Sequence, residues 1–204
     1  IHVWNSRANI FRRNVITDTR DGLYVQTANR TLIEDNTVYG VRYGLHYMYA
    51  DSNVFYRNVF YDNVAGAAVM YSKDIVMRHN VFLKNRGFAS FGILFQDCHG
   101  LSADSNVIAD NVVGMFFEGS IDNSFHHNII AQNDVALEMF QNSVNNTFSE
   151  NNFVDNLSPL LLIGKKSGSQ WTMGGRGNYW STYDGYDIDG DGIGDIPMKI
   201  ENVF

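Results

Sequence analysis

The chain has 204 residues, of which 45% are hydrophobic, 14% aromatic and 18% charged, and its formal net charge is −7. The negative charge argues against a nucleic-acid partner, because no basic patch with interleaved aromatic residues accompanies it. The sequence has no apolar run of 18 residues that could span a membrane. Its single cysteine, Cys98, excludes an internal disulfide.

The first residues already have the pattern of a repeat in mid-course. Ile1 to Trp4 align with Leu45 to Met48, so we expect the chain to be the C-terminal part of a longer repeat protein. An export signal would then lie outside the sequence, and its absence says nothing about export.

An asparagine followed by two apolar residues opens each repeat. It recurs at 22 or 23 residues, with one gap of 26, at Asn14, Asn36, Asn58, Asn80, Asn106, Asn128 and Asn151. A second asparagine follows five residues later, as at Asn63, Asn85, Asn111, Asn133 and Asn156. A fixed period of this length indicates a solenoid.

Short alternating apolar runs separated by Asn, Asp, Ser and Gly indicate strands and turns. A unit of about 22 residues holds about three short strands at ~3.3 Å per residue, which is one coil of a parallel β-helix. The leucine-rich pattern of another solenoid class with a similar period is absent. We therefore predict an all-β fold: a parallel β-helix of about seven to eight coils over residues 1–163, with stacked asparagines hydrogen-bonded along the axis.

Three columns of residues are expected to face inward. The first holds Leu23 and Val25, Leu45 and Tyr47, Ala67 and Val69, Ile93 and Phe95, Met115 and Phe117, Leu137 and Met139, and Leu160 and Leu162. The second holds Phe11, Ile33, Phe55, Met77, Ala103, Phe125 and Phe148, and the third Ile16, Val38, Phe60, Phe82, Ile108, Ile130 and Phe153. Cys98 falls in a column of small residues and is expected to be a buried turn residue.

Two outward columns carry the candidate metal ligands. His46 and Met48 stand two residues apart on one strand, and Met70 follows Met48 on the next coil, with His2 and Glu118 further along the same columns. An imidazole with two thioethers is a soft ligand set that suits Cu(I) better than Mg²⁺ or Ca²⁺. A packing or partner surface of methionines and aromatics is the alternative. The remaining histidine pair, His126 and His127, is expected to lie on the surface.

The coil after Asn80 has four extra residues, within the segment from Asn85 to Gly92. An insertion cannot join the stack, so it is expected to bulge from a corner. This bulge either exposes Phe88 and Phe91 to a partner or lets the two rings fold back onto the β-helix. With outward-facing Phe116, these are the candidate partner-binding residues.

The repeat ends after Leu162, and residues 164–204 are expected to cap the open end of the helix with Trp171, Tyr179 and Trp180. Within this segment, Asp187, Asp189, Asp191 and Asp195 are spaced like the start of a Ca²⁺-binding loop. The twelfth position is Met198, where an EF-hand needs a bidentate Glu, so the loop is either a looser Ca²⁺ site or a hydrated acidic turn.

A polysaccharide hydrolase or lyase would need two carboxylates at a workable distance in a groove. The best pair is Glu118 and Glu138, placed diagonally on successive coils. A secreted β-helix protein that binds or cleaves polysaccharide is therefore the alternative function.

The tail GNYWSTYDGYDIDGDGIGDIP, together with the Asn-rich coils and the segment GLHYMYADSNVFYRN, resembles the NosD family. The resemblance implies a right-handed parallel β-helix, no catalysis, a periplasmic location and a role in supplying copper during nitrous oxide reductase maturation. It also implies partners: an ABC-type ATPase with its membrane subunit, through which membrane contact is made, a copper-chaperone lipoprotein, and nitrous oxide reductase. No ligand motif is carried over from the family, so His46, Met48 and Met70 rest on the column argument alone.

Overall fold

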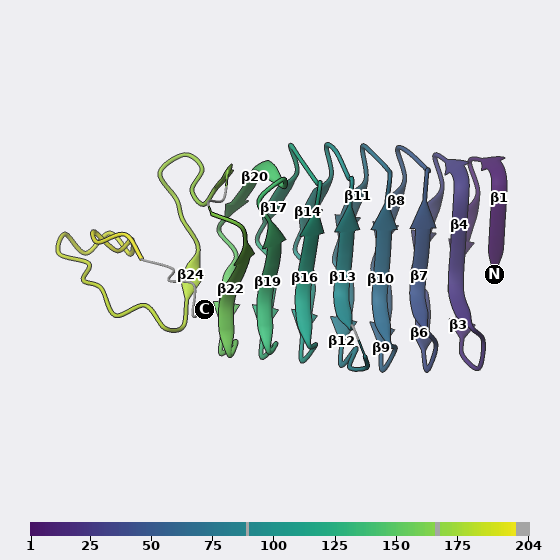
Figure 1. Ribbon diagram of the computed structural model, residues 1–204, viewed down its shortest axis with the longest axis horizontal. Coiled ribbons are helices and arrows are strands. Elements are labelled where there is room, and N and C mark those ends of the chain that lie inside the picture. Colours follow the sequence, from purple (N-terminus) through teal and green to yellow (C-terminus); the bar gives the residue numbers. More distant parts are fainter. Residues whose placement is uncertain (89, 166–167, 199–204) are drawn as a thin grey trace.

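The computed structural model describes residues 1–88, 90–165 and 168–198, and these wind into a solenoid with three parallel sheets of eight strands (Figure 1). Each sheet takes every third strand along the chain, so three consecutive strands make one coil. The predicted parallel β-helix of about seven to eight coils is confirmed, with eight strands in each sheet. No helix among the described residues is long and apolar enough to cross a membrane.

Sheet A contains the longest strands. It consists of β1 (His2–Arg7), β4 (Asp21–Asn29), β7 (Tyr43–Met48), β10 (Ala65–Met70), β13 (Phe91–Gln96), β16 (Val113–Glu118), β19 (Val135–Phe140) and β22 (Ser158–Ile163). Sheet B consists of β2 (Ile10–Arg12), β5 (Leu32–Glu34), β8 (Val54–Tyr56), β11 (Val76–Arg78), β14 (Ser102–Asp104), β17 (Ser124–His126), β20 (Val144–Ser149) and β23 (Gly168–Gln170). Sheet C consists of β3 (Val15–Ile16), β6 (Thr37–Tyr39), β9 (Val59–Tyr61), β12 (Val81–Leu83), β15 (Val107–Ala109), β18 (Ile129–Ala131), β21 (Asn152–Val154) and β24 (Tyr179–Trp180).

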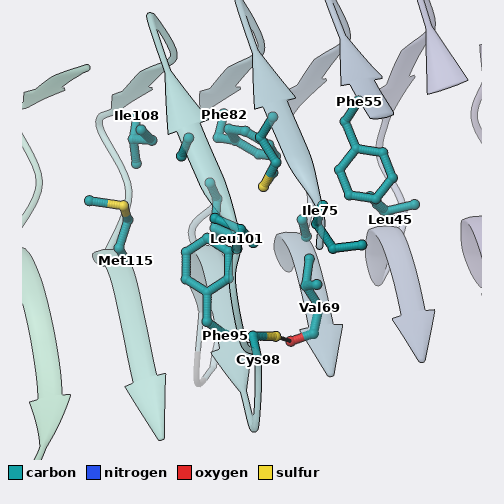
Figure 2. Close-up of a cluster of buried hydrophobic side chains, with 14 of the residues drawn as sticks. Leu45, Phe55, Val69, Ile75, Phe82, Phe95, Cys98, Leu101, Ile108 and Met115 are labelled. Carbon is teal, nitrogen blue, oxygen red and sulfur yellow. Dashed lines mark hydrogen bonds between the residues drawn. The ribbon is translucent and has the colours of Figure 1, made fainter. Parts of the chain in front are cut away.

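The three predicted inward columns form the core. Phe55, Phe82 and Phe95, one from each sheet, are almost fully buried, and Figure 2 shows them within the cluster of buried side chains. Phe11 and Leu162, near the two ends of the stack, are only partly buried. Burying each large side chain contributes roughly 1.5–3 kcal/mol, so the columns hold the coils together.

Cys98 is fully buried, as predicted, and its thiol donates a hydrogen bond to the carbonyl of Val69 at 3.2 Å (Figure 2). Burial raises the pKa of the Cys98 thiol to about 12. The thiol is therefore a structural group and not a thiolate ligand at neutral pH.

The asparagine ladders run along the axis as predicted. Asn58 Nδ2 donates to Asn80 Oδ1 at 2.9 Å, and Asn80 Nδ2 donates to Asn106 Oδ1 at 3.0 Å, across the coil with four extra residues. Asn85 and Asn111 continue the second ladder. The four-residue insertion therefore leaves both ladders in register.

One corner column between sheets C and A has left-handed backbone in the first seven coils. Its residues have φ between 49° and 66° and are Asp18, Gly40, Asp62, Lys84, Asp110, Gln132 and Asp155. Asp and Gly suit such a corner because they adopt left-handed backbone more readily than other residues. The acidic residues of this column are thus explained by backbone geometry.

The C-terminal segment continues the stack before it leaves it. The Trp180 ring stacks on Phe153 with centroids 4.0 Å apart, and Trp171 stacks on Phe148 at 4.9 Å. Asn178 extends the first ladder by accepting from Asn151 at 2.9 Å. Aromatic rings thus cover the open core, while parts of the expected cap, residues 166–167 and 199–204, lie outside the described residues.

Candidate metal-binding face

The outward face of sheet A brings the three predicted copper ligands together. His46 and Met48 point outward from β7, and Met70 of β10 is the register partner of Met48. Neighbouring strands lie ~4.8 Å apart and outward residues on one strand ~6.6 Å apart. All three side chains are partly exposed. The predicted juxtaposition is present, and binding of copper by it stays a prediction.

His46 lies in an aromatic slot. Its ring centroid is 4.5 Å from that of Tyr24 and 5.0 Å from that of Tyr43, and the side chain is only 16% exposed. The buried Nδ1 atom has no hydrogen-bond partner among the residues that the structure describes, and it faces Asp21 Oδ2 at 3.5 Å. Burial lowers the pKa of His46 more than the Asp21 carboxylate raises it. The imidazole is therefore neutral at physiological pH, which is the form that binds metals.

Asp21 is a site residue that the sequence analysis missed. It opens β4, and Arg42 donates to its two oxygens, from Nε at 2.9 Å and from Nη2 at 2.8 Å. Burial raises the pKa of Asp21, but the hydrogen bonds and charge of Arg42, with a smaller contribution from His46, bring it below its ordinary value. Asp21 is therefore an ionised carboxylate held against the inner nitrogen of His46. The repeat pattern gave no signal for Asp21, because its contacts with Arg42 and His46 depend on the direction of the side chains at the corner.

Tyr24 connects the histidine to the thioethers. Its hydroxyl lies 3.0 Å from Gln26 Oε1 and 3.6 Å from Met48 Sδ, and its single proton can be donated to either acceptor. The same ring stacks on His2 at 4.6 Å and so separates His2 from His46. Glu118 is separated from Met70 by Gln96. The structure therefore places His2 and Glu118 one coil too far away to share an ion with His46, Met48 and Met70.

The predicted surface histidines lie on sheet B and its edge. His126 Nδ1 is 2.6 Å from Ser149 Oγ, and His127 Nδ1 is 2.9 Å from Asp104 Oδ1. Glu150 lies 3.9 Å from the other nitrogen of His127. Because the two carboxylates contact opposite sides of the His127 ring, they do not converge with it on a single point.

The acidic loop brings three of its four predicted aspartates together. Carboxylate oxygens of Asp187, Asp189 and Asp195 lie within 4.8 Å of one another, and all three residues are exposed. Asp191 is outside this group and accepts a hydrogen bond from the Ile193 amide at 2.7 Å. The loop lies beyond the last coil, away from sheet A (Figure 1). Calcium binding here stays a prediction.

The two phenylalanines of the segment with the four-residue insertion lie in different surroundings. Phe88 is 98% exposed, whereas the Phe91 ring packs against Phe116 on sheet A with centroids 4.9 Å apart. Arg86 anchors the bulge by pairing with Asp110 at 3.1 Å and Asp134 at 2.7 Å. Phe91 thus folds back, while Phe88 projects from an anchored loop.

The carboxylate pair of the alternative function lies outside the two surface hollows found among the described residues. Glu118 and Glu138 stand in different outward columns of sheet A, and neither lines the two surface hollows of about 500 and 270 Å³. The larger hollow lies at the corner between sheets C and A and is lined by Thr19, Arg20, Gly40, Val41, Arg42, Asp62, Asn63, Val64 and Arg86. Neither of these two hollows of the described residues therefore brings Glu118 and Glu138 together around a sugar chain.

Comparison with known proteins gives the family. The model of the family described as periplasmic copper-binding protein (NosD) matches residues 1–185. A probable ABC transporter binding protein NosD from Stutzerimonas stutzeri is 30% identical over 96 residues, covering 47% of this chain and 22% of that protein. The protein of the same name from Pseudomonas aeruginosa is 28% identical over 100 residues, covering 49% of this chain and 23% of its own length. The aligned segment thus spans under a quarter of each relative, while the family match covers all eight coils and the start of the tail. The chain belongs to the NosD family.

Proposed function

We propose that this chain is a non-catalytic periplasmic accessory protein that binds Cu(I) as cargo on the outward face of sheet A. It delivers or scaffolds that copper for the copper centres of nitrous oxide reductase. His46, Met48 and Met70 are the proposed ligands. The family description as copper-binding supports the metal, and the names of the relatives support an ABC transporter as a partner. A copper-chaperone lipoprotein is the proposed donor.

The observation that carries the proposal is the orientation of His46. A metal-binding histidine characteristically directs its second ring nitrogen toward a carboxylate, which fixes the tautomer and the ring. Asp21, held by Arg42, occupies that place beside Nδ1, which leaves Nε2 as the nitrogen that binds. The adjacent thioethers of Met48 and Met70 complete a set of soft donors suited to Cu(I).

The first test is an anaerobic Cu(I) titration in competition with a chromogenic chelator. The double variant Met48→Ala/Met70→Ala is expected to lose high-affinity binding. Met173→Ala, which removes a 61% exposed methionine from the tail, is the matched control and is expected to bind as the wild type does. Tight binding retained by the double variant would move the site elsewhere, and no binding by the wild type would contradict direct copper handling by this face.

A second variant tests the orientation of the histidine. Asp21→Asn keeps the size of the side chain and removes its charge, so Cu(I) affinity is expected to fall about tenfold, at the low end of effects of carboxylates behind metal ligands. Asp35→Asn is the control, because Asp35 also pairs with an arginine, Arg57, but lies on a different edge of the coils. Equal affinity in Asp21→Asn and wild type would refute the orienting role.

A further inference from the structure

Sheet A continues past the copper site into an apolar surface that contains one half-buried carboxylate. Glu138 of β19 has Phe116 of β16 and Leu161 of β22 as its register partners. Phe140 projects from the same strand, with its ring centroid 5.7 Å from that of Phe116. These three apolar side chains are partly exposed. We call Phe116, Glu138, Phe140 and Leu161 the Glu138 patch.

The Glu138 carboxylate has neither an ion pair nor a hydrogen bond within the described part of the chain. Burial raises its pKa, and no cation among the residues that the structure describes offsets the effect. An unpaired carboxylate among apolar groups costs stability, and glutamine or leucine at this position would avoid that cost. A cationic group that pairs with the Glu138 carboxylate would remove that cost.

The charge of the face from β4 to β22, which leaves out β1 with its exposed Arg7, indicates what that group is. Strands β4, β7, β10, β13, β16, β19 and β22 contain no lysine or arginine. Their outward acids are Asp21, Glu118 and Glu138, of which Asp21 is already paired with Arg42. Sheet C offers a contrast, because strands β6 to β21 carry outward apolar residues such as Val81 and Ile129 but no charged residue. Of these two sheets, within the described residues, sheet A is the one that combines an apolar face with an unpaired acid.

From this complementarity we propose that the Glu138 patch docks a protein partner that presents a lysine or arginine surrounded by apolar side chains. The partner's cation pairs with Glu138, and its apolar side chains cover Phe116, Phe140 and Leu161. Truncating one side of a buried charge pair at an interface is costly, so Glu138 is the residue on which affinity depends most. An anionic lipid surface is disfavoured as the occupant, because both this face and the chain as a whole are negatively charged. The inference is independent of copper binding.

Photo-crosslinking of the full-length protein in its own cells tests the proposal. The photoreactive residue p-benzoylphenylalanine replaces Phe140 at the patch or, as a control, Tyr61 on the outward face of sheet C. Mass spectrometry then identifies what is attached. The expected result is a protein adduct from the Phe140 position whose cross-linked segment contains lysine or arginine among apolar residues. Adding the substitution Glu138→Arg to the chain with the photoreactive residue at position 140 should reduce the yield of the protein adduct at least about tenfold, equivalent to ~1.4 kcal/mol.

Thermal unfolding of Glu138→Gln separates docking from folding. Because this variant removes an unpaired carboxylate, its melting temperature should equal or exceed that of the wild type while the adduct decreases. A lipid adduct, an adduct without a cationic segment, a yield no higher than at Tyr61, or a yield unchanged by Glu138→Arg would each overturn the proposal.

Discussion

Replacing Asn106 by alanine would remove a side chain that makes four hydrogen bonds in the middle of the first ladder. Its Oδ1 accepts from the amide of Asn80 at 2.9 Å and from Asn80 Nδ2 at 3.0 Å. Its Nδ2 donates to the Met77 carbonyl at 3.0 Å and to Asn128 Oδ1 at 2.9 Å. Asn106 is 1% exposed, so water cannot replace these partners without rearrangement.

At about 1 kcal/mol for each hydrogen bond, Asn106→Ala is expected to lower the free energy of unfolding by about 4 kcal/mol. A typical domain has only about 5–15 kcal/mol in total, so a large part of the stability is at stake. Urea unfolding followed by circular dichroism measures the change.

The matched control is Asn142→Ala, which removes one exposed hydrogen bond from the Gly119 amide at 3.1 Å. It should cost under about 1 kcal/mol, because solvent can satisfy the amide. If the two variants lose equal stability, or if Asn106→Ala loses less than about 1 kcal/mol, the reasoning that the ladders hold the coils together is wrong.

Three further predictions follow from single side chains. The Cys98 thiol, with its pKa raised to about 12, should stay unreactive toward thiol reagents at pH 8 until denaturant unfolds the chain, and rapid labelling of the native protein would contradict its burial. The pKa of the Glu138 carboxyl is raised in the folded state, so the stability that this group contributes is present below its unfolded pKa near 4.5 and is lost as the pH rises through its folded pKa. Thermal unfolding should therefore show Glu138→Gln to be more stable than the wild type at pH 7 and equal to it at pH 3.5. Calcium at millimolar concentration should protect the tail from proteolysis in the wild type and not in Asp187→Asn, whereas identical cleavage with and without Ca²⁺ would identify a hydrated acidic turn.

Most of the fold could be predicted from the sequence because each coil repeats the same register. A residue 22 positions away becomes a direct neighbour, so the ladder from Asn14 to Asn151 and the contact between Met48 and Met70 follow from counting. The extra four residues do not disturb this, because they leave the stack at a corner.

The sequence did not predict contacts that depend on the direction of a side chain or that lie in segments without the repeat. Asn178 joins the first ladder 27 residues after Asn151, within a segment that has no repeat pattern. The contact of Asp21 with His46 depends on how the corner places Arg42. The exposure of Phe88 and the packing of Phe91 depend on the path of the inserted segment. None of these is fixed by periodicity.

The axial direction of the asparagine ladders and of the backbone bonds between coils has a mechanical consequence. A force that pulls the two ends apart acts along these bonds and loads one boundary between coils at a time. The coils should therefore detach singly at low force, each releasing about 70–80 Å of chain for its 22 residues. A force applied across the axis must instead shear many coil boundaries together. The molecule is thus expected to behave as an anisotropic spring, compliant along its length and stiff across it.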